Sequence, residues 1–450
     1  MPTISRYRSV QLAPQRGQAL IYGIFLMLGG LASLFFLFNT GQLIEEKTKL
    51  VNTADAVAYS ASVMHARALN FSSYTNRAMM ANEVTVAQMV SVSSWMQYAE
   101  THVKASSPLN CRTPQFSVPA VHGLIKYLPL CTAMALGPAS AAIAGVRSGV
   151  DGAAPELLLA GEAFKIQMQK AQALMFTVLL PARVELMQEV ANANYDNDGA
   201  IKVEETLTDH FTLFEGGSAV RPYTGEDRTR FREAAVAAAN EDKFITSRTW
   251  SDKSPWSDIC VPPRAKVDRT SRTELVGFDE WRANDEASME IESLRGLIPS
   301  CKTIASYDLG NGSRSAASNA KGMWLYTGVP TFFDLSPQAR AYSPDHADPD
   351  KRELRLRFAI RLTRANTETK TSMGRSAIKP EGRLKLYEGN EAKDVMAAVS
   401  TSEVFFDRPV PRAYGHRELA STFNPYWQAR LVGNSDAVVA AAVALQATGP

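Results

Sequence analysis

The chain has 450 residues, of which 45% are hydrophobic and 21% are charged. This composition is typical of folded proteins and excludes a chain that is disordered throughout. The length alone suggests two or three domains. The net charge of +2 argues against nucleic acid as a partner, because binding to phosphates requires a dense basic face.

Residues 17–44 carry no charge, and residues 19–38 within them are almost wholly apolar. About 20 such residues, at 1.5 Å each, cross the hydrocarbon core of a bilayer. Arg6, Arg8 and Arg16 precede this stretch, so the positive-inside rule predicts a cytoplasmic leader, residues 1–16, and export of everything after the anchor. A buried core helix would rarely run so long without a polar face. A cleaved signal peptide is the alternative, but its mature chain would begin with a strongly apolar segment.

Residues 45–194 form the predicted helical part of the exported chain. From Gln42 to Val103 the sequence is rich in Ala, Ser, Met and Val and has no Pro, and the polar run at residues 70–73 is a candidate for a break. The small side chains of residues 54–62 would let another helix approach closely, either from a partner or from the second helix of this chain. That second helix is expected from Glu156 to Ala193, with Pro155 as its first residue.

The uncharged stretch Tyr127–Val146 is a weaker candidate for a second membrane span. Its prolines, glycines and alanines favour buried structure in the exported part instead. A second span would also return the cysteine-bearing remainder of the chain to the cytoplasm.

Residues 195–450 are expected to form an α+β domain with a mainly antiparallel sheet. The clearest strand is Glu353–Arg364, where apolar and mostly basic residues alternate, which predicts one buried and one solvated face. Such a basic face could bind an acidic partner, but it is more often simply solvated. Further strand candidates are Phe244–Trp250, Thr303–Tyr307, Trp324–Tyr326, Arg383–Tyr387 and Glu403–Phe406.

The chain has four cysteines: Cys111, Cys131, Cys260 and Cys301. An even number without a C-x-x-C motif favours two disulfides in an oxidising compartment over zinc or redox chemistry. Three pairings are open, and proximity in the sequence favours Cys111–Cys131 and Cys260–Cys301.

One segment suggests a metal ion. Residues 194–205 resemble a twelve-residue EF-hand loop, in which a hard cation is held by oxygen atoms. The candidate calcium ligands are Asn194, Asp196, Asp198, the carbonyl of Ala200, and Glu205. Asn at the first position and Lys202 at the ninth depart from the motif, and an Asp-Gly turn between helix and strand is the alternative.

Catalytic motifs such as G-x-S-x-G, H-E-x-x-H and the Walker loop do not occur in the sequence. The glycines at 310 and 312 lack the third glycine of a dinucleotide-binding fingerprint and are expected to form a turn. We therefore expect no enzymatic activity and no small-molecule substrate.

The basic leader, the apolar helix and the run Asn52-Thr53-Ala54-Asp55-Ala56-Val57-Ala58-Tyr59-Ser60-Ala61 together resemble the N-terminus of TadE/TadG-like proteins of Flp pilus assembly. The resemblance covers about residues 14–66. It implies a bacterial, pilus-associated protein with an exported C-terminal part. Pseudopilins of this kind have Glu at the fifth position after a cleavage-site Gly, where this chain has Tyr22 after Gly17, so we expect an uncleaved anchor. The D-x-S-x-S metal motif of larger family members does not occur in the sequence.

The sequence thus predicts a non-enzymatic, single-pass protein of the bacterial inner membrane with a cytoplasmic N-terminus and a periplasmic C-terminal domain. Its expected partners are other pilus-assembly or pseudopilin-like proteins. A membrane-anchored calcium-binding adhesin or cell-surface binding protein is the alternative.

Overall fold

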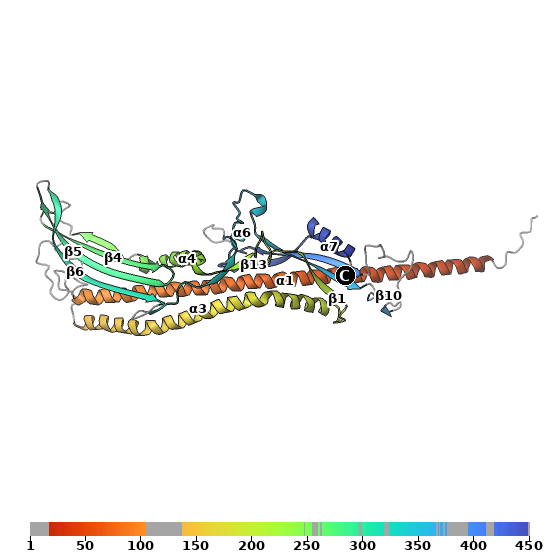
Figure 1. Ribbon diagram of the computed structural model, residues 1–450, viewed down its shortest axis with the longest axis horizontal. Coiled ribbons are helices and arrows are strands. Elements are labelled where there is room, and N and C mark those ends of the chain that lie inside the picture. Colours follow the sequence, from red (N-terminus) through yellow and green to blue (C-terminus); the bar gives the residue numbers. More distant parts are fainter. Residues whose placement is uncertain are drawn as a thin grey trace, which may run out of the picture.

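The computed structural model describes residues 18–104, 137–246, 248–253, 260–261, 263–296, 299–318, 324–365, 368, 370–371, 374–375, 395–410 and 418–448. Two long helices, α1 (Gln18–Lys104) and α3 (Gly137–Asn194), lie side by side and give the molecule an elongated shape (Figure 1). They are antiparallel, because Lys165 of α3 contacts Glu83 of α1 while Arg183, further along α3, contacts His65, earlier on α1. The expected helix Glu156–Ala193 is present, but α3 begins before Pro155, which lies inside it.

The expected break at residues 70–73 does not occur, and α1 is continuous through them. The polar side chains there have other roles. Asn70 Nδ2 donates to the carbonyl oxygen of Trp427 at 2.9 Å, and its Oδ1 accepts from the Trp427 backbone N–H at 3.0 Å. Ser72 and Ser73 bond back to helix carbonyls four residues earlier. A buried interface with the sheet therefore explains this polar run.

A four-stranded antiparallel sheet packs on α1 near its apolar end, in the order β1-β9-β12-β13. Its strands are β1 (Ile201–Asp209), β9 (Arg355–Ala365), β12 (Val395–Phe406) and β13 (Trp427–Val432). Strand β9 confirms the strongest strand prediction, but its second face is solvated over only part of its length. From Phe358 to Arg364 both faces are buried, and Arg361 bonds to Gln446 of helix α7 (Asp436–Thr448).

A five-stranded sheet packs on the opposite end of α1, in the order β3-β4-β5-β6-β7 (Figure 1). Its strands are β3 (Trp250–Lys253), β4 (Arg264–Val276), β5 (Glu280–Arg295), β6 (Ser300–Ala317) and β7 (Trp324–Leu325). The expected turn at residues 310–312 is wrong, since these residues lie within β6. An added Cβ at Gly312 would lie 2.1 Å from the carbonyl oxygen of Ser94, so glycine lets β6 approach the α1 backbone.

The chain also has several smaller elements, of which the pair β10–β11 lies, in the sequence, between β9 and β12 of the four-stranded sheet. They are the pair β2 (Val220–Tyr223) and β8 (Phe332–Leu335), the pair β10 (Lys370–Thr371) and β11 (Gly374–Arg375), the helices α4 (Thr229–Asn240), α5 (Lys243–Thr246) and α6 (Pro337–Arg340), and the 3-10 turns η2 (Gly225–Arg228) and η3 (Pro349–Lys351). The helix α5 covers residues 244–246 of the strand expected at Phe244–Trp250, and among its described residues only Trp250, at its end, lies in a strand, β3. The candidates Thr303–Tyr307, Trp324–Tyr326 and Glu403–Phe406 lie on or overlap β6, β7 and β12, whereas Arg383–Tyr387 lies outside the described residues.

Each of the four apolar cores contains residues of α1, including Met79, Leu50, Leu69 and Tyr98 in turn. The long helix is thus the support on which both sheets and α3 assemble. The fold class is α+β with mainly antiparallel sheets, as the sequence predicted.

Candidate functional site: the anchor helix and its attachment

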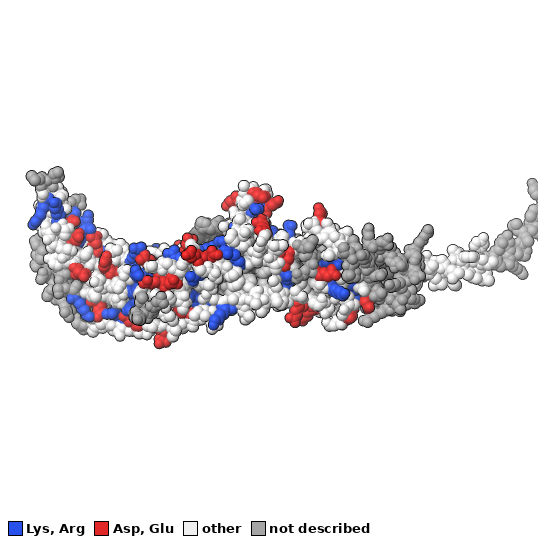
Figure 2. Space-filling model, viewed as in Figure 1, with Lys and Arg blue, Asp and Glu red and all other residues white. Residues whose placement is uncertain are grey.

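The first part of α1 extends beyond the rest of the protein (Figure 1) and shows no charged side chains (Figure 2). Its large apolar side chains from Leu20 to Phe38 are exposed, and none of its most apolar window is buried in the protein. The polar side chains of Ser33 and Asn39 donate to carbonyl oxygens four residues earlier, at 2.9 and 2.8 Å. This is the one described helix that is long and apolar enough to cross a membrane; residues 127–136 of the alternative span lie outside the described part.

The anchor passes into the folded part as one continuous helix. Leu43 packs against an apolar core, Lys47 Nζ donates to the carbonyl oxygen of Ala397, and Leu50 is fully buried. From Phe38 to Leu43 the helix rises about 8 Å. The near end of strand β12 therefore lies close to the end of the apolar stretch, and one continuous helix links the two.

The Ala-rich run that carries the family resemblance packs inside this chain. Ala54, Val57, Ala58 and Ala61 are fully buried, in a core that also contains residues of α3, β9 and β12. Ser62 Oγ lies 2.7 Å from Ser402 Oγ on β12. Asp55 accepts a hydrogen bond of 2.6 Å from Ser400 on the same strand. Small residues here let the sheet approach α1 closely.

A buried ionic cluster fixes α1 to α3 further along. Lys165 Nζ lies 3.0 Å from Glu83 Oε1 and 2.8 Å from Glu162 Oε2, and all three side chains are buried. Trp281 Nε1 and the Tyr326 hydroxyl both donate to Glu83 Oε2, at 3.0 and 2.6 Å. Burial raises the pKa of the Glu83 carboxyl, which Lys165 and these donors partly offset. The cluster joins α1, α3, β5 and the segment after β7.

A second buried group lies nearer the anchor. His65 Nε2 lies 3.2 Å from Arg183 NH1, which also bonds to Asp209 Oδ2 at 2.8 Å. Burial, reinforced by the charge of Arg183, lowers the pKa of His65 to about 3, so the imidazole is neutral and accepts from the guanidinium. His65 also stacks on Phe211, with ring centroids 4.2 Å apart. Each of these polar groups holds packed elements together, which is a structural role.

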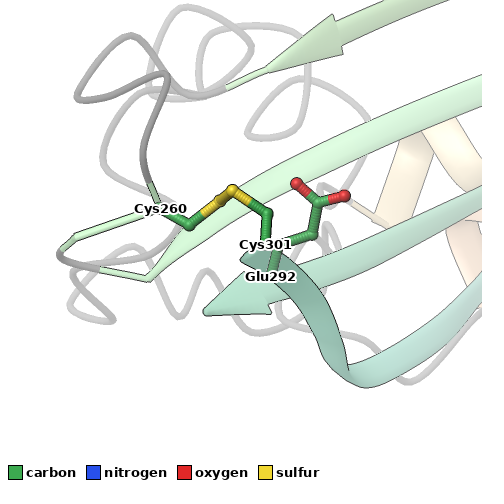
Figure 3. Close-up of side chains that lie close together, drawn as sticks. All are labelled: Cys260, Glu292 and Cys301. Carbon is green, nitrogen blue, oxygen red and sulfur yellow. A yellow bond between two sulfur atoms is a disulfide. The ribbon is translucent and has the colours of Figure 1, made fainter. Parts of the chain in front are cut away.

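Cys260 and Cys301 form a disulfide with a Cα–Cα distance of 5.8 Å. Figure 3 shows Glu292 beside it, and the three side chains are close enough to suggest a metal site. The two sulfur atoms are bonded to each other, however, and Glu292 Oε2 accepts from Arg264 Nε at 2.6 Å. The disulfide and the ion pair thus occupy these groups. Cys111 and Cys131 lie outside the described residues.

The candidate calcium loop connects α3 to β1 rather than to a second helix. Asp198 Oδ1 accepts from the Ala200 backbone N–H at 3.0 Å, and Asp198 Oδ2 lies 2.7 Å from Arg364. The Asn194 amide donates to the Val190 carbonyl oxygen at 2.8 Å. Asp196, Asn197 and Gly199 have positive φ, as a tight turn requires. The side chain of Glu205 lies outside the described part, and calcium binding here stays a prediction.

This arrangement of an exposed apolar helix end and an Ala-rich continuation agrees with the comparison with protein families. Residues 17–68 match the Tad family, described as TadE/G-like Flp pilus assembly. The matched segment comprises the anchor and the part of α1 that supports the four-stranded sheet. Comparison with curated proteins and with solved structures gives no match.

Proposed function

We propose that this chain is a non-enzymatic, membrane-anchored component of a bacterial Flp/Tad-type pilus-assembly or secretion apparatus. The observation that carries the proposal is the Tad match over residues 17–68 on a helix whose first part is exposed and apolar. An apolar helix end that continues without a break into the core of the folded part holds that part at a fixed height above a bilayer. This geometry suits a structural component of an assembly better than a mobile surface binder.

The proposed location is the inner membrane, with residues 1–16 in the cytoplasm and the folded part in the periplasm. Arg6, Arg8 and Arg16 before the span support this orientation, and so does the disulfide Cys260–Cys301, which requires an oxidising compartment. A reporter that is active only outside the cytoplasm, fused after Pro450, should be active. Activity of a cytoplasm-only reporter at that site would contradict the orientation.

Tyr22 supports an anchor that is not processed after Gly17. Sequencing the N-terminus of the membrane-bound protein should find residues that precede Gly17. A mature chain beginning at Gln18 would instead place the protein among processed pseudopilins.

The role in assembly can be tested in the bacterium that encodes this chain. Deleting the gene should abolish or strongly reduce pili on the cell surface, and the full chain should restore them. A variant with residues 1–44 replaced by a cleavable signal peptide should reach the periplasm in equal amount but fail to restore pili. Normal piliation in the deletion strain would overturn the proposed function.

A further inference from the structure

Helix α3 presents an apolar face that the described part of the chain leaves exposed. Between residues 157 and 184, all of which are described, Lys170 is the one charged residue among the exposed positions. The exposed large apolar residues are Leu157, Leu159, Phe164, Leu174, Val178, Leu180 and Val184. Leu174 is 64% exposed. The edge of the molecule that α3 forms is correspondingly largely white in Figure 2. Continuous apolar surface of this kind marks interaction sites.

Part of this face follows a heptad pattern. Alternating steps of three and four residues connect a set that we name the α3 seam: Leu157, Ala160, Phe164, Gln167, Ala171, Leu174, Val178 and Pro181. Every member is uncharged. This spacing is typical of the contact line of a coiled coil, where the residues of one helix insert between those of its partner. If the apolar residues of α3 served only to pack against the core of this chain, its exposed side would not show the heptad pattern.

We propose that the α3 seam joins two copies of this chain, which stand parallel in one membrane. The inference rests on the proposed anchoring. Because one end of the molecule is anchored, all copies in a membrane have the same direction and the same height. The helix α3 lies along α1 (Figure 1), so two seams related by a two-fold axis along the helices meet over their whole length.

The charges and side-chain sizes of the seam fit this pairing. Ala160 and Ala171 provide room for close approach of the helices, and Gln167 meets its own copy, where two amides can hydrogen-bond. Lys170 lies beside the seam rather than on it. In a parallel pair its neighbour across the interface is the uncharged Met175, so no like charges are brought together.

The size of the surface explains why the membrane matters. From Leu157 to Pro181 the helix rises about 36 Å, and a contact line about 10 Å wide buries roughly 400 Å² on each copy. This is about half of what one partner buries in a standard interface. Two copies held in one membrane have a raised effective concentration, which compensates for a small interface. The test therefore uses the full chain in membranes.

Variants that add one cysteine to the four native ones distinguish the seam from the neighbouring surface of α3. Leu174→Cys and Ala173→Cys place a thiol at adjacent exposed positions, and only the first lies on the seam. In oxidising conditions, membranes with Leu174→Cys should yield a disulfide-linked species whose mass is twice that of this chain. The wild type and Ala173→Cys should stay monomeric on the same non-reducing gel. Equal linking of both variants, no linking of either, or linking of Leu174→Cys to a different protein would each overturn the proposal.

A second measurement does not depend on disulfide chemistry. The full chain in lipid nanodiscs should have the mass of two copies, and Leu174→Glu should reduce it to one while the chain stays folded. A monomeric wild type would overturn the proposal that the α3 seam joins two copies. Failure of the wild type to sediment with membranes would instead contradict the anchoring, so the two failures can be told apart.

Discussion

Lys165 Nζ of α3 lies 3.0 Å from Glu83 Oε1 of α1, and both side chains are fully buried. Lys165 also donates to the carbonyl oxygen of Gly328 at 2.8 Å. A buried ion pair contributes little net stability relative to an apolar pair of the same shape, but the loss of one partner is costly. Lys165 thus sets the register between the two long helices, because Glu83 and Glu162 depend on it for their charge balance.

Replacing Lys165 with Met should therefore destabilise the protein by about 3–5 kcal/mol, since two carboxylates then lack a buried cation. Chemical denaturation of the full chain in detergent measures this change. Lys170→Met on the exposed side of the same helix is the matched control and should change the stability by less than about 0.5 kcal/mol. Similar effects of the two substitutions would show that the cluster does not hold the helices.

The neutral state of His65 predicts a loss of stability in mild acid. The pKa of His65 is lowered to about 3, below the ordinary 6.5. The contribution of the neutral imidazole to the free energy of unfolding is therefore complete above pH 6.5 and declines as the pH falls toward 3. At pH 5 the loss is about 2 kcal/mol. His65→Gln retains an acceptor for Arg183 and does not titrate, so its stability should fall less between pH 7 and 5.

Titration of the Asp209 carboxyl does not contribute to the difference in acid sensitivity between the wild type and His65→Gln. Burial alone would raise its pKa, but Arg183 and hydrogen bonds hold the pKa below its ordinary value, so it stays ionised in this window. Equal acid sensitivity of the wild type and His65→Gln would contradict a buried neutral imidazole.

Gly312→Ala should destabilise the packing of the five-stranded sheet on α1. The new Cβ would lie 2.1 Å from the Ser94 carbonyl oxygen and 2.5 Å from the Tyr98 backbone nitrogen, and neither backbone atom can move freely. Overpacking of this kind costs about 1–3 kcal/mol or more. Thermal unfolding measures the loss. Gly433→Ala, where an added Cβ meets no atom within 4 Å, should leave Tm nearly unchanged.

Removing the disulfide should cost about 4 kcal/mol, the chain-entropy value for Cys260 and Cys301 at a separation of 41 residues. Cys260→Ala, Cys301→Ala and the double variant should lose the same amount, because each removes one and the same bond. Peptide mapping without reduction should recover this pair, and we predict Cys111 linked to Cys131. Additive losses in the double variant would show that the two sulfurs act independently.

Calcium binding at residues 194–205 has to displace Arg364 from Asp198. If the loop binds calcium, millimolar calcium should raise the Tm of the Arg364→Gln variant more than it raises that of the wild type. Calcium should not raise the Tm of Asp198→Ala. At ten times the dissociation constant the gain is about 1.4 kcal/mol. Calorimetry without a heat of binding in the wild type and in Arg364→Gln would leave the Asp-Gly turn as the full explanation.

Several strands escaped prediction from the sequence. Strand β5 alternates regularly, with Trp281, Ala283, Ala287 and Met289 facing the core, but the charged Asp285 lies between them on the same face. In the structure Asp285 is buried and bonds to Arg248 at 3.0 Å and to Arg269 at 3.1 Å. Because both partners are distant in the sequence, no local pattern indicates that Asp285 is buried.

The sequence by itself determined the apolar anchor and the amphipathic part of strand β9, because hydrophobicity and its period are local properties of the chain. Only the tertiary structure decided that the Ala-rich run of α1 supports a sheet of the same chain. It also decided that Gly310 and Gly312 belong to a strand pressed against a helix, and that Lys165 neutralises Glu83. These features depend on which distant residues meet when α1 and α3 align. That alignment follows from burying the apolar side chains of distant segments in shared cores, and no short stretch of sequence contains this information.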